Sequence, residues 1–250
     1  MDHAVKLGVI DAVEPISQAV ADADLVLLAI PVGQMPHVME TIAPHLASQA
    51  IITDAGSTKG DVATAARTHL QGALQRFVPG HPIAGAEKSG VLAARTELFD
   101  GKKVVLTPLR ENSAAAVSAV GNFWRGCGAD VVEMPVDTHD RIFAAVSHLP
   151  HVLAFALVEE IAHRPNADQL FAYAAGGFRD FSRIAGSSPE MWRDICLANR
   201  DAMLNELDAY IARLADIRRL IQANDGKSLA AAFEHARNAR TAWADTQQKK

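Results

Sequence analysis

The chain has 250 residues, 49% hydrophobic and 21% charged, which is enough to bury the core of one large or two ordinary domains. The formal net charge is −5 with basic and acidic residues interspersed, which excludes the basic patch that nucleic-acid binding needs. The longest apolar runs fall far short of the roughly 20 residues that span a bilayer, and no basic-then-apolar leader opens the chain. We therefore expect a soluble, cytoplasmic protein with no nucleic-acid or membrane partner.

Short apolar runs alternate with helix-length segments from residue 23 to about residue 134. The predicted strands are Leu25–Ile30, Ile51–Thr53, a short buried strand at 76–79, Val104–Thr107 and Asp130–Met134. The predicted helices are Gln34–Leu46, Lys59–Leu70 and Ser113–Cys127. Strands separated by helices of this length indicate βαβ units and a parallel sheet. The Leu25–Ile30 run lacks polar alternation, as expected of a strand covered on both faces.

The strand pattern ends after Pro135, and residues 137–245 are predicted to be helical with short breaks. The fold class is therefore α/β followed by all-α, with domains at 1–136 and 137–250. Ser187-Ser188-Pro189-Glu190 combines serine caps, a first-turn proline and a glutamate, which predicts a helix start. Cys127 and Cys196 lie in helical segments, and a single pair makes neither a disulfide framework nor a four-ligand metal site, so we expect reduced core thiols.

One long predicted helix carries an apolar stripe. Its residues are spaced alternately four and three apart, namely Met203, Leu207, Tyr210, Leu214, Ile217 and Ile221. Such a stripe requires a partner surface. It is either part of an internal helical core or, together with the apolar segment 155–161, part of a homodimer interface.

The most informative string is Gly80-His81-Pro82-Ile83-Ala84-Gly85-Ala86-Glu87-Lys88-Ser89-Gly90. It places His81 where a predicted strand meets a loop, and its glycines let the backbone approach a ligand closely. His81 is a candidate acid or base; the alternative is a loop histidine that hydrogen-bonds its neighbours.

Two further segments end predicted strands at one edge of the sheet. Asp54-Ala55-Gly56-Ser57-Thr58-Lys59 places Gly56 and Ser57 where ligands bind in open α/β sheets, beyond the carboxyl ends of strands. Pro31 and Val32 follow the neighbouring strand at the same edge. The alternatives are that Ser57 is an ordinary helix cap and Pro31 a strand terminator.

The helical half holds two candidate segments. In Ser147-His148-Leu149-Pro150-His151, Pro150 is expected to kink the helix and tilt His148 toward a cleft. No third and fourth ligand follow these histidines, so no metal site is expected. After Gly176-Gly177, Arg179 and Arg183 offer bidentate recognition of a carboxylate; the alternative is a solvated helix face.

These segments, taken in chain order, resemble the prephenate dehydrogenase family, which includes arogenate and cyclohexadienyl dehydrogenases, from Leu7 onward. The resemblance implies a Rossmann-like domain and a helical dimerisation domain, with NAD or NADP as cofactor and a homodimer as the assembly. It further implies oxidation at C4 of prephenate with loss of the ring carboxylate, giving 4-hydroxyphenylpyruvate in tyrosine biosynthesis. Arogenate is the alternative substrate.

The resemblance also implies a role for each matching residue. His81 would accept a hydrogen bond from the C4 hydroxyl as hydride leaves, and Ser57 would lie beside both His81 and the nicotinamide. Arg183 would hold a substrate carboxylate, and the substrate pocket would be lined by His148, Gly85 and Trp192, the last from the same or the other subunit. Pro31, Val32, Gly56 and Ser57 would contact the cofactor, and no metal is implied.

The chain departs from the family pattern in two places. Ala86 stands where many relatives have a threonine, and the sequence has no G-x-G-x-x-G turn for the pyrophosphate. We therefore expect a truncated dinucleotide-binding domain, weak NAD or NADP binding, and Leu25–Ile30 as an exposed edge strand that lowers solubility. A catalytically silent remnant is the alternative function, whereas hydroxyacid and 6-phosphogluconate dehydrogenases lack these strings.

Overall fold

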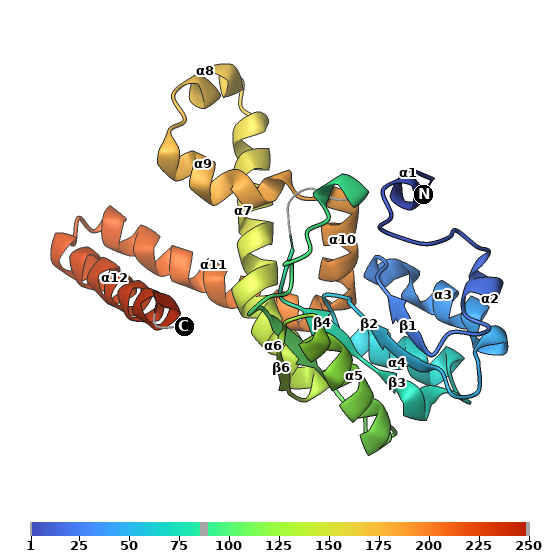
Figure 1. The fold of residues 1–250 in the computed structure, drawn as a ribbon. Coiled ribbons are helices and arrows are strands. Elements are labelled where there is room, and N and C mark those ends of the chain that lie inside the picture. The colour runs from blue at the N-terminus through green and yellow to red at the C-terminus, as the bar shows by residue number, and fades with distance from the viewer. Residues whose placement is uncertain (1, 86–89, 249–250) are drawn as a thin grey trace. The chain divides into compact units, whose positions relative to one another are not determined.

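The computed structural model describes residues 2–85 and 90–248, and alternating strands and helices precede a helical region (Figure 1). Two compact units are formed, residues 1–203 and residues 204–250. The order of elements confirms the predicted succession of α/β and all-α halves. The predicted domain boundary at residues 136/137 remains a prediction. The division into compact units is a different one and falls between residues 203 and 204, within a single long helix.

The first sheet is parallel and follows two short N-terminal helices, α1 (Asp2–Lys6) and α2 (Ile16–Ala19). Its strands are β1 (Leu25–Leu28), β2 (Ile51–Asp54) and β3 (Phe77–Val78), in the order β1-β2-β3. Among the described residues β1 pairs with β2 alone, so the expected edge position is confirmed. The helices α3 (Met35–Ile42) and α4 (Gly60–His69) pack their apolar faces against these strands.

The second sheet contains an arrangement that the alternating pattern does not predict. Its strands are β4 (Gly80–Pro82), β5 (Lys103–Leu106) and β6 (Asp130–Glu133). β5 and β6 are parallel, but β4 pairs with β5 antiparallel, with His81 opposite Val105. Pro79 separates β3, which pairs with β2, from β4, which pairs with β5, and because proline has no N–H, it cannot donate a hydrogen bond to either neighbouring strand. The helix α5 (Ala114–Gly126) is capped by the Ser113 side chain and packs Trp124 against this sheet.

The helical region starts with an irregular helix. α6 (Val136–Phe143) continues through a π-helical turn at Ala144–His148 into α7 (Leu149–Ala162). Pro150 lies in the first turn of α7 and cannot donate to the carbonyl of Val146 one turn earlier, so the wider turn fits this position. The expected irregularity at Pro150 is present as this π-turn.

Five further α-helices follow α7 within the described residues. The start signal at Ser188 is confirmed, because its side chain accepts a hydrogen bond from the Met191 N–H at 3.3 Å. Both cysteines are free and half-buried. The five helices are α8 (Ala167–Ala172), α9 (Gly176–Ser182), α10 (Pro189–Ala198), α11 (Arg200–Gln222) and α12 (Gly226–Gln248).

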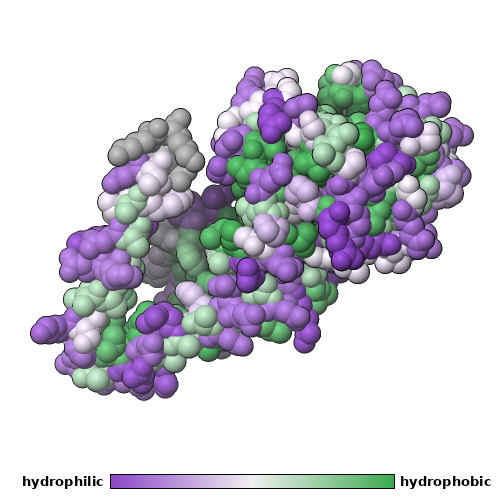
Figure 2. Space-filling model, turned by 90° about the horizontal axis from the view of Figure 1, so that it is seen from below, coloured by the Kyte–Doolittle hydropathy of each residue, from purple (hydrophilic) through white to green (hydrophobic). Residues whose placement is uncertain are grey.

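Large apolar side chains remain exposed on the helices. In the stripe on α11, Met203 is buried, but Leu214 is 48% exposed and Ile221 is 61% exposed. In contrast to the expectation from the uninterrupted apolar runs, the helical segment Val136–Ala162 is long and apolar enough to cross a membrane by length and composition alone, a test that the core helix of a soluble protein also passes. Figure 2 shows exposed apolar residues interspersed with hydrophilic ones on one face. The described chain therefore does not cover all of its apolar helix faces by itself.

Candidate active site

A buried ion pair joins the ends of three elements around the site. The Lys59 ammonium, just before α4, lies 2.5 Å from an Asp54 carboxylate oxygen at the end of β2 and 2.6 Å from the Gly80 carbonyl in β4. Both side chains are fully buried. Asp54 also accepts hydrogen bonds from the N–H groups of Gly56 and Gly80. These contacts hold the loop after β2 against the strand that carries His81.

The predicted cofactor residues lie at the carboxyl ends of β1 and β2. Pro31 and Val32 follow β1, and Gly56 and Ser57 follow β2. A Cβ at Gly56 would lie 2.8 Å from an Asp54 carboxylate oxygen and 3.0 Å from a Val32 methyl, so this turn requires glycine. Val32 and Gly56 are buried, whereas Pro31 is exposed and Ser57 is half-buried. All four lie beyond the carboxyl ends of parallel strands, which is where ligands bind in open α/β sheets.

The candidate substrate site is a cleft of about 520 Å³, within the usual range for a small-molecule site. Four of the predicted residues line it, namely His81, Gly85, Arg183 and Trp192. The cleft is thus formed by β4 and the loop after it, by α7 and its π-turn, and by α10 with the turn before it. The predicted departure at Ala86 lies outside the described residues.

Of the two histidines in the Ser147–His151 segment, His151 lines the cleft. Its ring stacks on Trp192 with centroids 3.6 Å apart, and its Nδ1 lies 2.9 Å from the Ser147 carbonyl. His148, which the resemblance places in the pocket lining, is not among the residues that line this cleft: it is buried, and its Nδ1 accepts a hydrogen bond from the Asn199 amide at 3.2 Å. Burial lowers the pKa of His148 to about 4, while the nearby Ser57 backbone opposes this shift.

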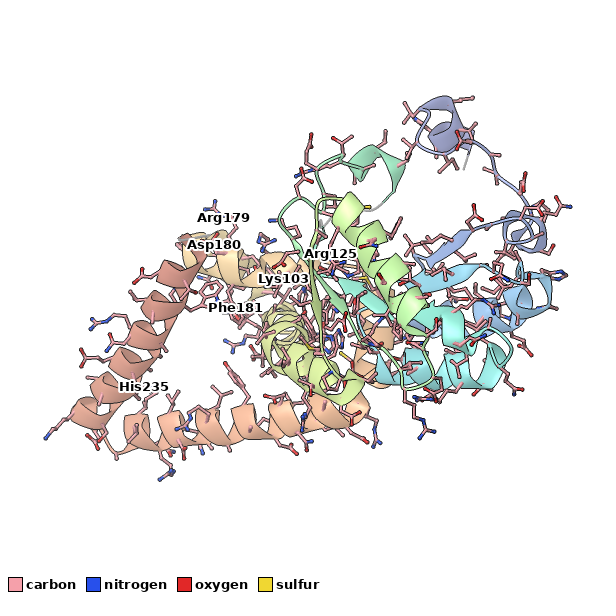
Figure 3. All side chains as sticks on the ribbon, turned by 60° about the horizontal axis from the view of Figure 1, so that its bottom comes forward. Lys103, Arg125, Arg179, Asp180, Phe181 and His235 are labelled. Carbon is pink, nitrogen blue, oxygen red and sulfur yellow. The ribbon has the colours of Figure 1, made fainter. Side chains whose placement is uncertain are left out.

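Arg179 and Arg183 have different surroundings. Arg183 lines the cleft, whereas the Arg179 side chain is 82% exposed and projects from α9 beside Asp180 (Figure 3). The solvated helix face considered for this segment therefore describes Arg179 and Asp180.

His81 is hydrogen-bonded to a second histidine, His139, which belongs to none of the predicted site segments. The His81 Nδ1 lies 2.8 Å from the His139 Nε2, and the His139 Nδ1 lies 2.8 Å from an Asp140 carboxylate oxygen. Asp140 also accepts hydrogen bonds from the backbone N–H groups of Lys59 and Gly60 at 2.9 and 2.8 Å. The Phe143 ring packs against both histidines, with centroid distances of 4.8 and 4.5 Å.

The three hydrogen-bonded side chains, His81, His139 and Asp140, differ in how their surroundings shift their pKa values. Burial, together with the nearby Lys59 ammonium, holds the pKa of His81 well below its usual range. Burial also lowers the pKa of His139, although the hydrogen bond to Asp140 opposes the shift. Burial alone would raise the pKa of Asp140, but hydrogen bonds from His139 and the backbone of Gly60 and Lys59 keep it low. At neutral pH, therefore, His81 and His139 are neutral imidazoles and Asp140 is a carboxylate.

Sequence reasoning misses His139, Asp140 and the role of Lys59. The one available signal is a His-Asp pair at the start of an otherwise apolar helical segment. That signal is weak, because the pair becomes meaningful only when the fold brings it against β4, which is 58 positions away along the chain.

Comparison with known proteins gives two family matches. Residues 1–133 match the model described as "Prephenate dehydrogenase, nucleotide-binding domain", and residues 135–235 match "Prephenate dehydrogenase, dimerization domain". The first match confirms the Rossmann-like character predicted for the α/β half.

Individual proteins give the same result. The prephenate dehydrogenase of Bacillus subtilis (strain 168) is 40% identical over 95% of this chain and 64% of that protein. The cyclohexadienyl dehydrogenase of Zymomonas mobilis is 38% identical over 96% of this chain and 83% of that protein. The structure of prephenate dehydrogenase from A. aeolicus with hydroxyphenyl propionate and NAD+ has a TM-score of 0.89 at 37% identity, over 96% of this chain and 84% of that one. The chain thus spans slightly less than two thirds of the Bacillus protein.

Proposed function

The chain belongs to the prephenate dehydrogenase family, and from that membership we propose that it oxidises prephenate to 4-hydroxyphenylpyruvate with NAD or NADP in tyrosine biosynthesis. The observation that carries the proposal is that His81 and Arg183 line the same cleft. A cleft that presents an imidazole acceptor, His81, and a guanidinium, Arg183, suits a substrate that has both a hydroxyl to deprotonate and a carboxylate to hold.

Each residue of the cleft has a distinct role in this proposal. His81 accepts the proton of the C4 hydroxyl, a task suited to a neutral imidazole. Arg183 holds a substrate carboxylate, and Trp192 with Gly85 shapes the pocket. His151 lines the pocket, and His148 lies behind it, where its ring contacts that of Trp192 with centroids 6.0 Å apart.

Pro31, Val32, Gly56 and Ser57 present the cofactor side of the site. Bound NAD or NADP would supply the acceptor for the hydride that leaves C4. Val32 packs against Trp192 and Ile195, so this strand end also contacts a helix that forms the substrate cleft. That contact would keep the cofactor residues next to the substrate cleft.

The test is steady-state reduction of NAD and of NADP with prephenate and with arogenate, on the 250-residue chain and on an upstream-extended chain. In whichever form is active, His81→Asn should lower turnover by roughly 10²–10⁴-fold and leave cofactor affinity nearly unchanged. The matched control is His37→Asn, because His37 is exposed on α3. Near-normal turnover in His81→Asn would remove His81 from the proposed role.

Other outcomes separate the remaining possibilities. Activity with arogenate alone would reassign the substrate. A chain that binds substrate but reduces neither cofactor in either form would support a silent binding module instead.

We further propose that the protein is a cytoplasmic homodimer. Support comes from the description of the family domain matched by residues 135–235 and from the apolar faces left exposed on the helices. A second copy would cover these faces.

A further inference from the structure

The hydrogen bonds of Asp140 fix one end of a chain of polar groups. A carboxylate has no proton to donate, so the Nδ1 of His139 must donate to it across 2.8 Å. The N–H groups of Lys59 and Gly60 bind the same carboxylate from the start of α4 and keep it in place. The Asp140 side chain is 13% exposed, and His139 is fully buried, so water cannot readily replace these contacts.

The constraint then passes through His139 to His81. A neutral histidine carries one ring proton, so a His139 that donates from Nδ1 has an unprotonated Nε2. That Nε2 accepts the hydrogen bond at 2.8 Å, and therefore the proton lies on the Nδ1 of His81. The Nε2 of His81 is left unprotonated.

From this geometry we propose that His139 and Asp140 are positioning residues that fix the tautomer of His81, so that its Nε2 is a free acceptor for the substrate hydroxyl. This inference rests on the proposed function, because it assigns a purpose to the free Nε2. Phe143 supports the arrangement, since its ring packs against both imidazoles and restricts their rotation.

The proton balance follows from the tautomer. When the substrate O–H bond breaks, its proton forms the Nε2–H bond of His81, and its electron pair forms the C4=O bond as hydride leaves C4; bound NAD or NADP would accept that hydride. His81 is then an imidazolium that still donates from Nδ1 to His139. Both other protons stay where they were, so Asp140 remains a carboxylate, and its negative charge favours the transient cation. Loss of the ring carboxylate as carbon dioxide then returns an electron pair to the ring, and the oxygen takes the proton back from His81 to give the phenol.

Other charged and titratable groups also act on His81. Lys59, from the start of α4, and His148, from the π-turn, both disfavour a positive charge on the His81 ring, as does His139. Asp54 and Asp140 act in the opposite direction on His139. His81 therefore remains an unprotonated acceptor at neutral pH, and the carboxylate behind His139 offsets part of the cost of charging it.

The decisive experiment reads the tautomer directly. In the protein labelled with ¹⁵N-histidine, long-range ¹H–¹⁵N correlations report which nitrogen of each ring is protonated, and His81→Asn assigns the His81 signals. The wild-type protein should show His81 protonated on Nδ1. This measurement needs neither substrate nor turnover, so its failure is distinguishable from failure of the proposed function.

Two variants of one position provide the kinetic test. His139→Leu removes the acceptor, so the His81 signals should change to the Nε2-protonated form or a mixture, and kcat should fall about 10²-fold. The KM values for substrate and cofactor should change less than about threefold. His139→Gln keeps a carbonyl oxygen able to accept from His81, and should restore the Nδ1 tautomer and most of kcat. His37→Leu, on the exposed face of α3, is the control for histidine loss.

Three results would overturn the inference. One is a wild-type His81 protonated on Nε2, a result that stands even if His139→Leu does not fold. Another is a folded His139→Leu protein with unchanged kcat and an unchanged His81 tautomer. Equal losses in the Leu and Gln variants without any change of tautomer would also reject it, because they would show a purely structural role.

Discussion

Arg179 and Arg183 lie one helical turn apart, yet only one of them faces the candidate substrate. Arg183 lines the cleft with His81, whereas Arg179 projects from α9 beside Asp180. Sequence spacing alone gives both arginines the same weight, because either could form a bidentate pair with a carboxylate. The turn that follows α9 decides between them, and its direction depends on tertiary packing.

Replacing these arginines one at a time tests the carboxylate assignment. We expect Arg183→Ala to raise the KM for prephenate roughly 30-fold or more, which corresponds to about 2 kcal/mol or more, because a charge partner of the substrate is lost. Arg183→Lys should recover only part of this, since one ammonium cannot replace the planar fork. Arg179→Ala is the matched control, and a larger KM effect there would reverse the assignment.

The buried histidine His148 makes folding stability depend on pH. Because burial lowers its pKa from 6.5 to about 4, the unfolded chain binds more protons than the folded chain between these values. Stability should therefore be complete above about pH 6.5 and fall as the pH drops toward 4. The contribution of this group is on the order of 3 kcal/mol.

Urea unfolding at a series of pH values between 7 and 4 measures this effect. In His148→Gln the free energy of unfolding should depend less steeply on pH than in the wild-type protein. His81, His139 and His151 also have lowered pKa values, so the variant should keep part of the slope. Parallel curves for the two proteins would exclude His148 as a source of the pH dependence.

At the scale of elements, the Lys59–Asp54 pair connects β2, α4 and β4 within the interior. A buried ion pair is costly to break, because the remaining charge has no water to solvate it. We expect Lys59→Met to destabilise the fold by about 3–5 kcal/mol in chemical unfolding.

An exposed pair on the same domain provides the control. Lys103, labelled in Figure 3, forms a salt bridge with Asp130. The two side chains are 47% and 58% exposed, so Lys103→Met should change stability by less than about 1 kcal/mol. Similar losses in the free energy of unfolding for the two substitutions would mean that the buried Lys59–Asp54 pair does not stabilise the contact between β2, α4 and β4.

How far the sequence predicts the elements depends on the range of the interactions involved. The α5 and α10 helix starts follow from Ser113 and Ser188, whose side chains bond to an N–H three residues later. The apolar runs locate β1, β2, β5 and β6. The antiparallel β4 and the His81–His139 contact depend on residues that meet only after folding, and no local pattern encodes them. Four of the predicted site residues line one cleft, and these four could be identified from the sequence because they lie in or near the family motifs.

At the scale of the whole molecule, the exposed apolar stripe on α11 tests the proposed homodimer. Light scattering should report a mass about twice the 26.7 kDa of one chain. Leu214→Glu should produce monomers, because it buries a charge in the interface if the stripe is covered by a second copy.

Ala212→Glu introduces the same charge away from the stripe and should leave the mass unchanged. A wild-type protein of single-chain mass at micromolar concentration would contradict the homodimer.

The π-turn at Ala144–His148 has a consequence for how this helix tolerates change. Each residue of an α-helix advances the direction of the side chains by about 100°, so an added residue shifts the phase of everything that follows. The side chains after the turn, such as His151, therefore point in directions that differ from those that an uninterrupted α-helix continuing from His139 would give them. Substitutions of Ala145 should leave that offset intact, whereas deleting Ala145 should rotate His151 by about 100° away from Trp192. Circular dichroism should then show nearly normal helix content in a deletion variant that no longer turns over substrate. Insertions and deletions, more than substitutions, therefore limit how the sequence of this segment can change during evolution.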